Sequence, residues 1–287
     1  MIYPDYFDPK LSLRLIGLKD KFIFFKNLIL KNELPKVTCL SGEKGSGKST
    51  LVNHLLHFIY DEKNYNIEDN IIDKTKNFHN LFVSSTFPNI IYLKSESYKS
   101  VKIEDIRKLK QDILKTPIIS NKRFVILDDV ENFSLNSLTA LLKIIEEPNE
   151  NNYFILINNK SKLLIETIKS RSIDFKIILK RNDKDEIINS LIKVLNIKPV
   201  INNRLVDVTP GNFIKFDYIL SQNKINPEEK LIKNLDILLK IFKKERDIFF
   251  KDLLFFLVDY NFKITNTKKT SYPNKIIEKK KLYYKEY

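Results

Sequence analysis

The residues best suited to chemistry form a loop of eight, from Gly42 to Ser49, that fits the pattern G-x-x-x-x-G-K-[ST] without deviation. Glycines in such a loop let successive backbone N–H groups turn toward phosphate oxygens, and the start of a following helix adds partial positive charge. In that arrangement the Lys48 ammonium reaches the β- and γ-phosphates, and the Ser49 hydroxyl binds Mg²⁺. The pattern therefore predicts a site for ATP or ADP with Mg²⁺, against the alternatives of a chance match or a loop that has lost its nucleotide. Its residues are Gly42, Glu43, Lys44, Gly45, Ser46, Gly47, Lys48, Ser49 and Thr50.

A pair of carboxylates follows the strand-like run of residues 124–127. Asp128 ends that run, where a P-loop protein places the carboxylate that holds the magnesium shell. Asp129 stands where a glutamate often orients the attacking water, and its side chain is one methylene shorter. Because a displacement of about 1 Å can cost about a hundredfold in rate, we expect nucleotide binding with little or no hydrolysis by the isolated chain. The alternative for Asp129 is a plain turn residue.

The composition excludes several classes of protein. Apolar residues make up 43% of the 287 residues, which is enough for a folded core. Cys39 is the only cysteine, so a disulfide framework and a cysteine zinc site are excluded and we expect no zinc. His54, His57 and His79 are interpreted as ordinary packing residues rather than metal ligands. The chain has no apolar run of 18 residues and no secretory signal pattern, so we expect a soluble cytoplasmic protein without a membrane partner.

The chain has a formal net charge of +14. This charge indicates either attraction to nucleic acid or a lysine-rich composition spread over solvated faces. The run Lys279–Lys281 near the end of the chain is interpreted as a solvated helix face, with a nucleic-acid patch as the alternative. Charge alone therefore does not identify a partner.

Strands and helices alternate between residues 36 and 179. Continuous apolar runs, which are typical of strands covered on both faces, predict strands at 36–41, 89–93, 123–128, 153–157 and 175–179. Apolar residues at helical spacing predict helices at 20–31, 49–60, 101–115 and 134–147. Residues 61–88 are polar and are expected to form an irregular connection with weak helix content. The alternation predicts an α/β fold, with a parallel sheet that carries helices on both faces.

Beyond residue 180 the strand signals disappear. Only helices are predicted there, at 183–196, 201–206, 211–222 and 227–262. We therefore expect an α/β domain over residues 1–179, a small helical domain over 180–224 and a second helical domain over 225–287, for which an incomplete C-terminus stays open.

Several ordered motifs resemble those of clamp-loader subunits of the AAA+ superfamily. Residues 125–148 contain Asp128-Asp129, Ala140–Lys143 and Glu146-Glu147-Pro148 at the spacing of a stretch that reads DE…NALLKxLEEPP in that family. Three further segments are similar to its TIxSRC, LPHA and HPDL motifs: Thr167–Ser172, Glu33–Pro35 and Phe87–Ile90. The resemblance covers about residues 11–220. It implies a P-loop AAA+ domain followed by a small helical lid and a helical collar that assembles with other subunits.

Within this family the chain is most similar to δ′ subunits of bacterial DNA polymerase III. The γ/τ motor subunits usually carry a cysteine zinc module after the P-loop helix, and this chain has no cysteine there. They also carry a G-x-x-R arginine in the lid, where this chain reads Gly211-Asn212-Phe213-Ile214; Thr209-Pro210-Gly211 instead resembles the SPG of δ′ lids. The resemblance implies a stator that helps load a sliding clamp onto primer–template DNA, in a hetero-oligomer with other clamp-loader subunits. The alternatives are a γ/τ-like ATPase motor subunit, an unrelated P-loop kinase or ATPase, and an AAA+ protein that binds no nucleotide.

The resemblance also assigns roles to individual residues outside the P-loop. Arg171 matches the arginine finger that contacts the γ-phosphate of a neighbouring subunit, and the alternative is a surface arginine paired with an acidic neighbour. Asn159 matches the polar sensor of the γ-phosphate, with Asn158 as the alternative if the register shifts by one residue. The pair Ile16-Gly17 matches one that borders the adenine.

Overall fold

The computed structural model describes residues 3–95, 100–119, 122–245 and 249–268. By their contacts these residues divide into two compact units. The first unit contains Met1–Lys198 and Val208–Lys215, and the second contains Pro199–Asp207 and Phe216–Tyr287. The division into three domains at residues 180 and 225 stays a prediction, and Lys279–Lys281 lies outside the described residues.

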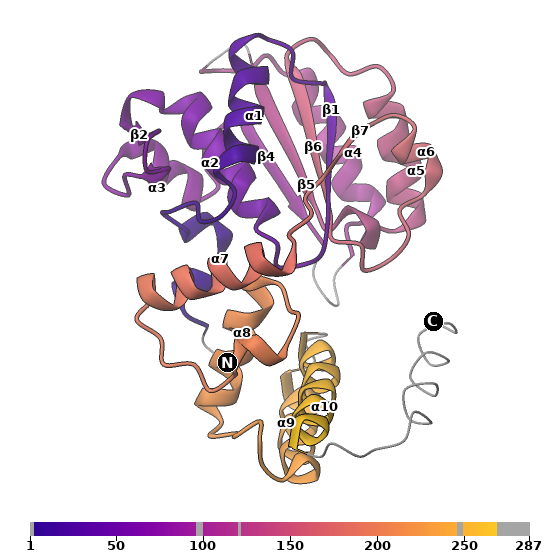
Figure 1. Cartoon of the computed structure of the whole chain (residues 1–287). Helices are drawn as coiled ribbons and strands as arrows, with labels where there is room; N and C mark the ends of the chain where they lie inside the picture. The colour runs from indigo at the N-terminus through magenta and orange to yellow at the C-terminus, as the bar shows by residue number, and fades with distance from the viewer. Residues whose placement is uncertain (1–2, 96–99, 120–121, 246–248, 269–287) are drawn as a thin grey trace. The chain divides into compact units, whose positions relative to one another are not determined.

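A five-stranded parallel sheet forms the centre of the first unit (Figure 1). Its strand order is β4-β5-β6-β1-β7. The strands are β1 (Val37–Ser41), β4 (Ile90–Lys94), β5 (Arg123–Asp128), β6 (Asn152–Asn158) and β7 (Ile173–Lys176). All five predicted strands are present, but β7 starts and ends earlier than expected. The reason is its partner: Ser41, the last residue of β1, pairs with Lys176, so residues 177–179 have no strand beside them.

Helices cover both faces of this sheet (Figure 1), as the sequence predicts. One face packs against α1 (Lys19–Leu30) and α2 (Lys48–Tyr60), and the other packs against α4 (Ile103–Leu114), α5 (Leu135–Ile145) and α6 (Glu166–Lys169). Alternate side chains of β6 divide between the two cores. Ile155 and Ile157 join the core of α1 and α2, whereas Phe154 and Leu156 join the core of α4 and α5.

The connection between α2 and β4 is more ordered than the sequence suggests. It contains a short hairpin of β2 (Tyr65–Asn66) and β3 (Ile71–Ile72), then helix α3 (Asn77–Val83). Tyr65, Phe78 and Phe82 are buried in the core beside α2. Helix α3 agrees with the weak helix content expected for this segment, whereas the hairpin was not predicted. The connection is more ordered than expected because a few aromatic residues in a polar segment bury enough apolar surface to fix it.

The three histidines are buried in this same part of the core. His54 Nδ1 lies 2.9 Å from the Tyr65 hydroxyl, and His57 Nε2 lies 3.2 Å from His79 Nδ1. Burial lowers the pKa of His54 to about 3 and that of His57 to about 4. Both rings are therefore neutral at physiological pH and act as hydrogen-bonded packing residues.

The described residues beyond β7 are mainly helical. The helices are α7 (Arg181–Val194), α8 (Pro210–Gln222), α9 (Leu231–Glu245) and α10 (Phe249–Lys268). The helix predicted at 201–206 is wrong, since only a 3₁₀ turn forms at Asn203–Leu205. Asn202 has an extended backbone, with φ −83° and ψ 106°, and its side-chain oxygen accepts a hydrogen bond from the Arg204 N–H at 3.1 Å, so no helix runs through residues 201 and 202. The helical region predicted over 227–262 forms two helices, α9 and α10, that pack against each other.

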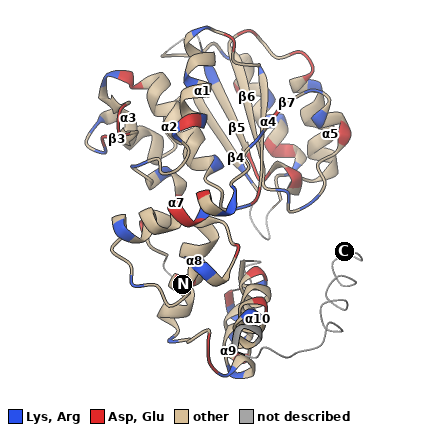
Figure 2. Cartoon of the chain, in the orientation of Figure 1, with Lys and Arg blue, Asp and Glu red and all other residues tan. Residues whose placement is uncertain are grey.

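Charged side chains are spread over many elements of the chain. Figure 2 shows Lys and Arg on most of the labelled helices, interspersed with Asp and Glu. None of the helices in the described ranges combines the length and the apolar composition that a membrane span needs.

Candidate nucleotide site

The phosphate-binding pattern lies between β1 and α2, as the sequence predicts. Gly45 and Gly47 have φ angles of +82° and +87°, a backbone conformation that residues other than glycine rarely adopt. Gly47 is the N-cap of α2, so Lys48, Ser49 and Thr50 form its first turn. The partial positive charge of this helix end therefore lies directly behind the loop.

Carbonyl groups of this loop accept hydrogen bonds from Lys48, and several of its amides have no protein acceptor in the described part of the chain. Lys48 Nζ donates to the carbonyl oxygens of Gly42 and Glu43 at 2.8 and 2.7 Å. Within the described residues, the N–H groups of Lys44, Gly45 and Gly47 donate to no protein group. Unpaired N–H groups beside a helix N-terminus can donate hydrogen bonds to phosphate oxygens.

The pKa of the Lys48 ammonium is lowered toward neutral pH. The side chain is 2% exposed, and this burial lowers its pKa to about 8. The nearby carboxylates of Asp128, Glu131 and Asp129 act in the opposite direction and favour the charged form. At neutral pH the group is therefore still charged and able to bind an anion.

The two predicted magnesium ligands meet at the C-terminal end of β5. Ser49 Oγ lies 3.3 Å from Asp128 Oδ2. The Tyr92 hydroxyl donates to the same carboxylate oxygen at 2.7 Å, and Lys94 Nζ lies 3.9 Å from it. The Asp129 N–H donates to the other oxygen, Oδ1, at 3.0 Å. A hydroxyl and a buried carboxylate in this arrangement are oxygen donors of the kind that Mg²⁺ prefers.

The Asp129 carboxylate accepts a hydrogen bond from Asn159, the residue predicted to sense the γ-phosphate. Asn159 Nδ2 donates to Asp129 Oδ1 at 2.6 Å. Asn158, the alternative, points elsewhere, since its side-chain oxygen accepts from the Lys160 N–H at 2.9 Å. The geometry thus brings Asn159 rather than Asn158 to the pair of aspartates.

Glu131 is a site residue that the sequence reasoning missed. Its Oε1 accepts three hydrogen bonds from the loop after β6: from Asn159 N at 3.1 Å, Ser161 N at 3.2 Å and Ser161 Oγ at 2.8 Å. The residue is 5% exposed, and Oε2 is buried without a hydrogen-bond partner in the described part of the chain. Glu131 therefore fixes the backbone that carries Asn159. Its only signal in the sequence is its place two residues after Asp129.

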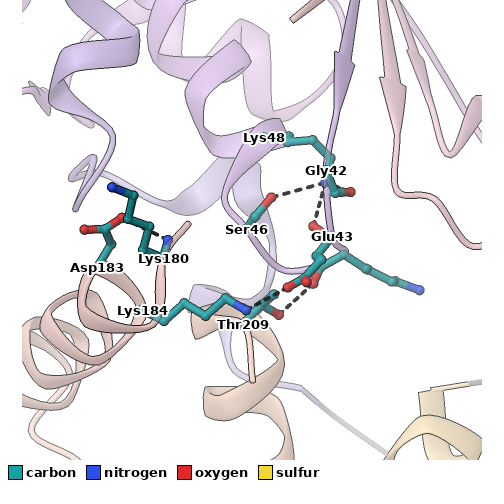
Figure 3. Close-up of polar contacts among 9 residues, drawn as sticks. Gly42, Glu43, Ser46, Lys48, Lys180, Asp183, Lys184 and Thr209 are labelled. Atoms are coloured by element: carbon teal, nitrogen blue, oxygen red, sulfur yellow. Dashed lines mark hydrogen bonds and ion pairs between the residues drawn. The ribbon is translucent and has the colours of Figure 1, made fainter. Parts of the chain in front are cut away.

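Three further contacts come from residues far along the chain, and Figure 3 shows two of them. Lys184 Nζ, on α7, pairs with Glu43 Oε2 at 2.9 Å. The Thr209 hydroxyl donates to the Lys44 carbonyl at 2.6 Å, and the Gly211 N–H donates to the Gly45 carbonyl at 2.9 Å. Two signals in the sequence mark Gly211: the scarcity of glycine, of which the chain has only five, and its place in the lid motif Thr209-Pro210-Gly211.

Glycine also appears where the N-terminal segment approaches the site. Gly17 has a φ of +75°, and a Cβ at this position would overlap with the side chain of Ile187 on α7. The side chain of Leu18 lies against Gly47 of the loop. The predicted adenine border at Ile16-Gly17 is thus next to α7 and to the P-loop.

Arg171 lies after α6 and is paired within its own chain. Its guanidinium donates to Glu146 Oε1 at 2.9 Å and to the Thr167 carbonyl at 3.2 Å. These described contacts are the surface ion pair that the sequence left open as the alternative to a finger. The side chain keeps 34% of its surface exposed.

A parallel sheet with a glycine-rich loop between β1 and α2, and a carboxylate at the end of β5, defines the P-loop class of α/β proteins. A family model described as DNA polymerase III, delta subunit matches residues 17–180, which is more than half of the chain. The chain therefore belongs to this family, which consists of clamp-loader proteins of the AAA+ superfamily.

Individual relatives carry the names of two different subunits. The chain is 30% identical to the DNA polymerase III subunit delta′ of Pseudomonas aeruginosa over 94 residues, 32% of this chain and 29% of the relative. It is 31% identical to the DNA polymerase III subunit gamma of Buchnera aphidicola subsp. Schizaphis graminum over 103 residues, 36% of this chain and 28% of the relative. The aligned part thus spans less than a third of either relative.

Among solved structures, a DNA polymerase III gamma subunit-related protein from Thermotoga maritima aligns over 84% of this chain and 92% of its own. The two are 15% identical, with a TM-score of 0.45.

Proposed function

We propose that this chain is a δ′-like subunit of a DNA polymerase III clamp loader that helps to load a sliding clamp onto primer–template DNA. The observation that carries the proposal is membership of the family, together with motifs that match δ′ subunits where γ/τ subunits differ. The lid stretch Gly211–Ile214 has no arginine, and no cysteine follows the P-loop helix. Its partners are then the other clamp-loader subunits, the clamp and the DNA.

The site is proposed to bind ATP or ADP with Mg²⁺. The residues present fit this group, because the unpaired amides of Lys44, Gly45 and Gly47 and the ammonium of Lys48 match phosphate oxygens. Ser49 and Asp128 would hold the Mg²⁺. When bound, the metal neutralises phosphate charge. The protein contributes binding and orientation, and Asn159 is assigned the role of sensing the γ-phosphate.

Little or no ATP turnover is proposed for the isolated chain. The Asp129 carboxylate is one methylene shorter than the usual glutamate, and it already accepts a hydrogen bond from Asn159. Arg171 is proposed to act in trans, on nucleotide bound by a neighbouring subunit. To do so its guanidinium must leave Glu146 or share it, and an ion pair this exposed costs only about 0.2–1 kcal/mol to break.

A γ/τ-like motor subunit is the second candidate, since relatives named DNA polymerase III subunit gamma also match this chain. Turnover separates the two. A motor subunit shows an ATPase rate on the order of 1 s⁻¹ or more when assembled from identical copies, whereas a stator shows almost none. An unrelated P-loop kinase would instead phosphorylate an acceptor without any clamp-loader partner.

Calorimetric titration of Mg-ADP into wild type, Lys48→Ala and Lys36→Ala tests the nucleotide proposal. Lys36 lies at the other end of β1 and serves as the matched control. Binding is expected in wild type and in Lys36→Ala, with a loss of at least tenfold in Lys48→Ala. No heat from wild type, or equal affinity in all three proteins, contradicts a functional P-loop.

A further inference from the structure

Four consecutive carbonyl groups of the P-loop each accept a hydrogen bond. Those of Gly42 and Glu43 accept from Lys48, within the loop itself. Those of Lys44 and Gly45 accept from Thr209 and Gly211, more than 160 residues further along the chain. We call residues 209–211, which lead into the first turn of α8, the lid turn. The lid turn therefore supplies the hydrogen bonds to two of these four carbonyls.

The direction of a carbonyl fixes the direction of the next amide. In a trans peptide the C=O and the following N–H point to opposite sides, and the described chain has no cis peptide. Because Thr209 Oγ1 draws the Lys44 carbonyl toward the lid turn, the Gly45 N–H points away from it. That amide donates to no protein group in the described residues.

The local turn could in principle adopt either orientation of this peptide. Residues Glu43–Ser46 form a turn closed by the Ser46 N–H and the Glu43 carbonyl at 3.3 Å, a long and weak bond. Gly45, with φ +82°, occupies the third position, where a type II turn needs a positive φ. Type I and type II turns differ by a flip of the central peptide, which here is the one between Lys44 and Gly45. A short contact from Thr209 therefore selects one of two accessible states.

The lid turn also fits against the loop too closely for any larger residue. A Cβ at Gly45 would lie 2.6 Å from Thr209 Oγ1, and a Cβ at Gly211 would lie 2.9 Å from Gly45 Cα. Gly45 and Gly211, two of the five glycines of the chain, are thus in direct backbone contact with each other. Such a fit holds the turn in register with the loop.

We propose that Thr209 is a positioning residue for the phosphate site: its hydroxyl orients the Lys44–Gly45 peptide so that the Gly45 amide is presented to a phosphate. The inference rests on the proposed nucleotide function and adds a residue that touches neither phosphate nor metal. It also gives this chain a link between the lid turn and the phosphate loop that needs no lid arginine. Gly211, through its N–H, gives the same support to the next peptide.

Selective labelling of glycine with ¹⁵N tests this directly, because only five backbone amides are then observed. Gly45 is the only glycine that follows a lysine, and Gly211 is the only one that follows a proline, so both can be assigned through the preceding residue. The variants are Thr209→Val, Thr209→Ser and the control Thr139→Val. Thr139 Oγ1 donates to the Leu135 carbonyl at 2.9 Å on α5, so its loss removes a similar bond elsewhere.

In the absence of nucleotide, Thr209→Val should move the Gly45 and Gly211 signals, while Thr209→Ser restores them and Thr139→Val moves none. With Mg-ADP added, Thr209→Val should bind about fivefold more weakly than wild type, the effect of one neutral hydrogen bond, and Thr209→Ser within twofold of it. Unchanged Gly45 and Gly211 signals in Thr209→Val, or unchanged ADP affinity, overturn the role of Thr209. If the signals move as expected but Mg-ADP shifts no glycine in wild type, the proposed nucleotide function fails instead.

Discussion

Glu131 offers the sharpest test of how the site is built. One buried oxygen of its carboxylate accepts two backbone N–H groups and one hydroxyl from residues 159–161. Glu131→Ala leaves both N–H groups without this acceptor. A fully buried N–H without a partner costs about 1–3 kcal/mol, and the cost is smaller here because Asn159 is half-buried and Ser161 is exposed. We therefore expect the free energy of unfolding to fall by about 2 kcal/mol, which for a unit of this size lowers the melting temperature by about 4–8 °C.

Glu131→Gln separates the loss of the acceptor from the loss of charge. The glutamine oxygen can occupy the place of Oε1, and its amide group takes the place of Oε2, which has no hydrogen-bond partner now. We expect a loss of about 1 kcal/mol, because a neutral acceptor is weaker than a charged one. Glu147→Ala, an exposed glutamate just beyond α5, is the control and should stay within about 0.5 kcal/mol of wild type.

Thermal unfolding followed by circular dichroism measures all three variants. The same proteins can be titrated with ATP and ADP, where Glu131→Ala should reduce any preference between the two nucleotides, because Asn159 is no longer fixed on Asp129. If Glu131→Ala has the same melting temperature as wild type, the carboxylate does not hold residues 159–161 and this part of the account is wrong.

Three other outcomes follow from the same geometry. With the pKa of Lys48 about 8, Mg-ADP affinity should be constant below about pH 7.5 and fall above pH 8 as the ammonium loses its proton. The same lowered pKa affects the free energy of unfolding of the free chain. Between pH 8 and pH 10.5 only the unfolded chain keeps this proton, so the contribution of Lys48 to stability rises with pH in that range. In a reconstituted complex, Arg171→Ala and Arg171→Lys should both lower the ATPase rate while Glu146→Gln does not, and full turnover in both arginine variants would return Arg171 to a surface role. Tyr92→Phe should lower the free energy of unfolding by about 1–3 kcal/mol through the lost bond to Asp128, and a melt identical to wild type would contradict that bond.

The features that the sequence predicted well are those encoded by neighbouring residues. The P-loop is a contiguous pattern, and the buried strands appear as unbroken apolar runs because both faces of a parallel sheet are covered. The meeting of Ser49 and Asp128 also followed, since the C-terminal ends of parallel strands lie at one edge of the sheet and α2 begins just beyond that end of β1.

The features that the sequence did not predict depend on residues brought together only by folding. Thr209 and Gly211 meet Lys44 and Gly45 across more than 160 residues, and no local pattern specifies such a contact. Glu131 looks like any polar residue after a strand until the loop beyond β6 is placed beside it. The end of β7 was missed for a related reason, since a strand stops where its partner β1 stops.

The central claim is that this chain works as a subunit of a clamp loader, and co-purification from native cells tests it most directly. The full chain, carrying a tag, is recovered under mild conditions and the bound chains are identified by mass spectrometry. The account predicts other members of the DNA polymerase III clamp-loader family and the sliding clamp in defined proportion to the tagged chain, with the same set retained by Lys36→Ala. Recovery of the chain alone, or with partners unrelated to replication, would contradict it.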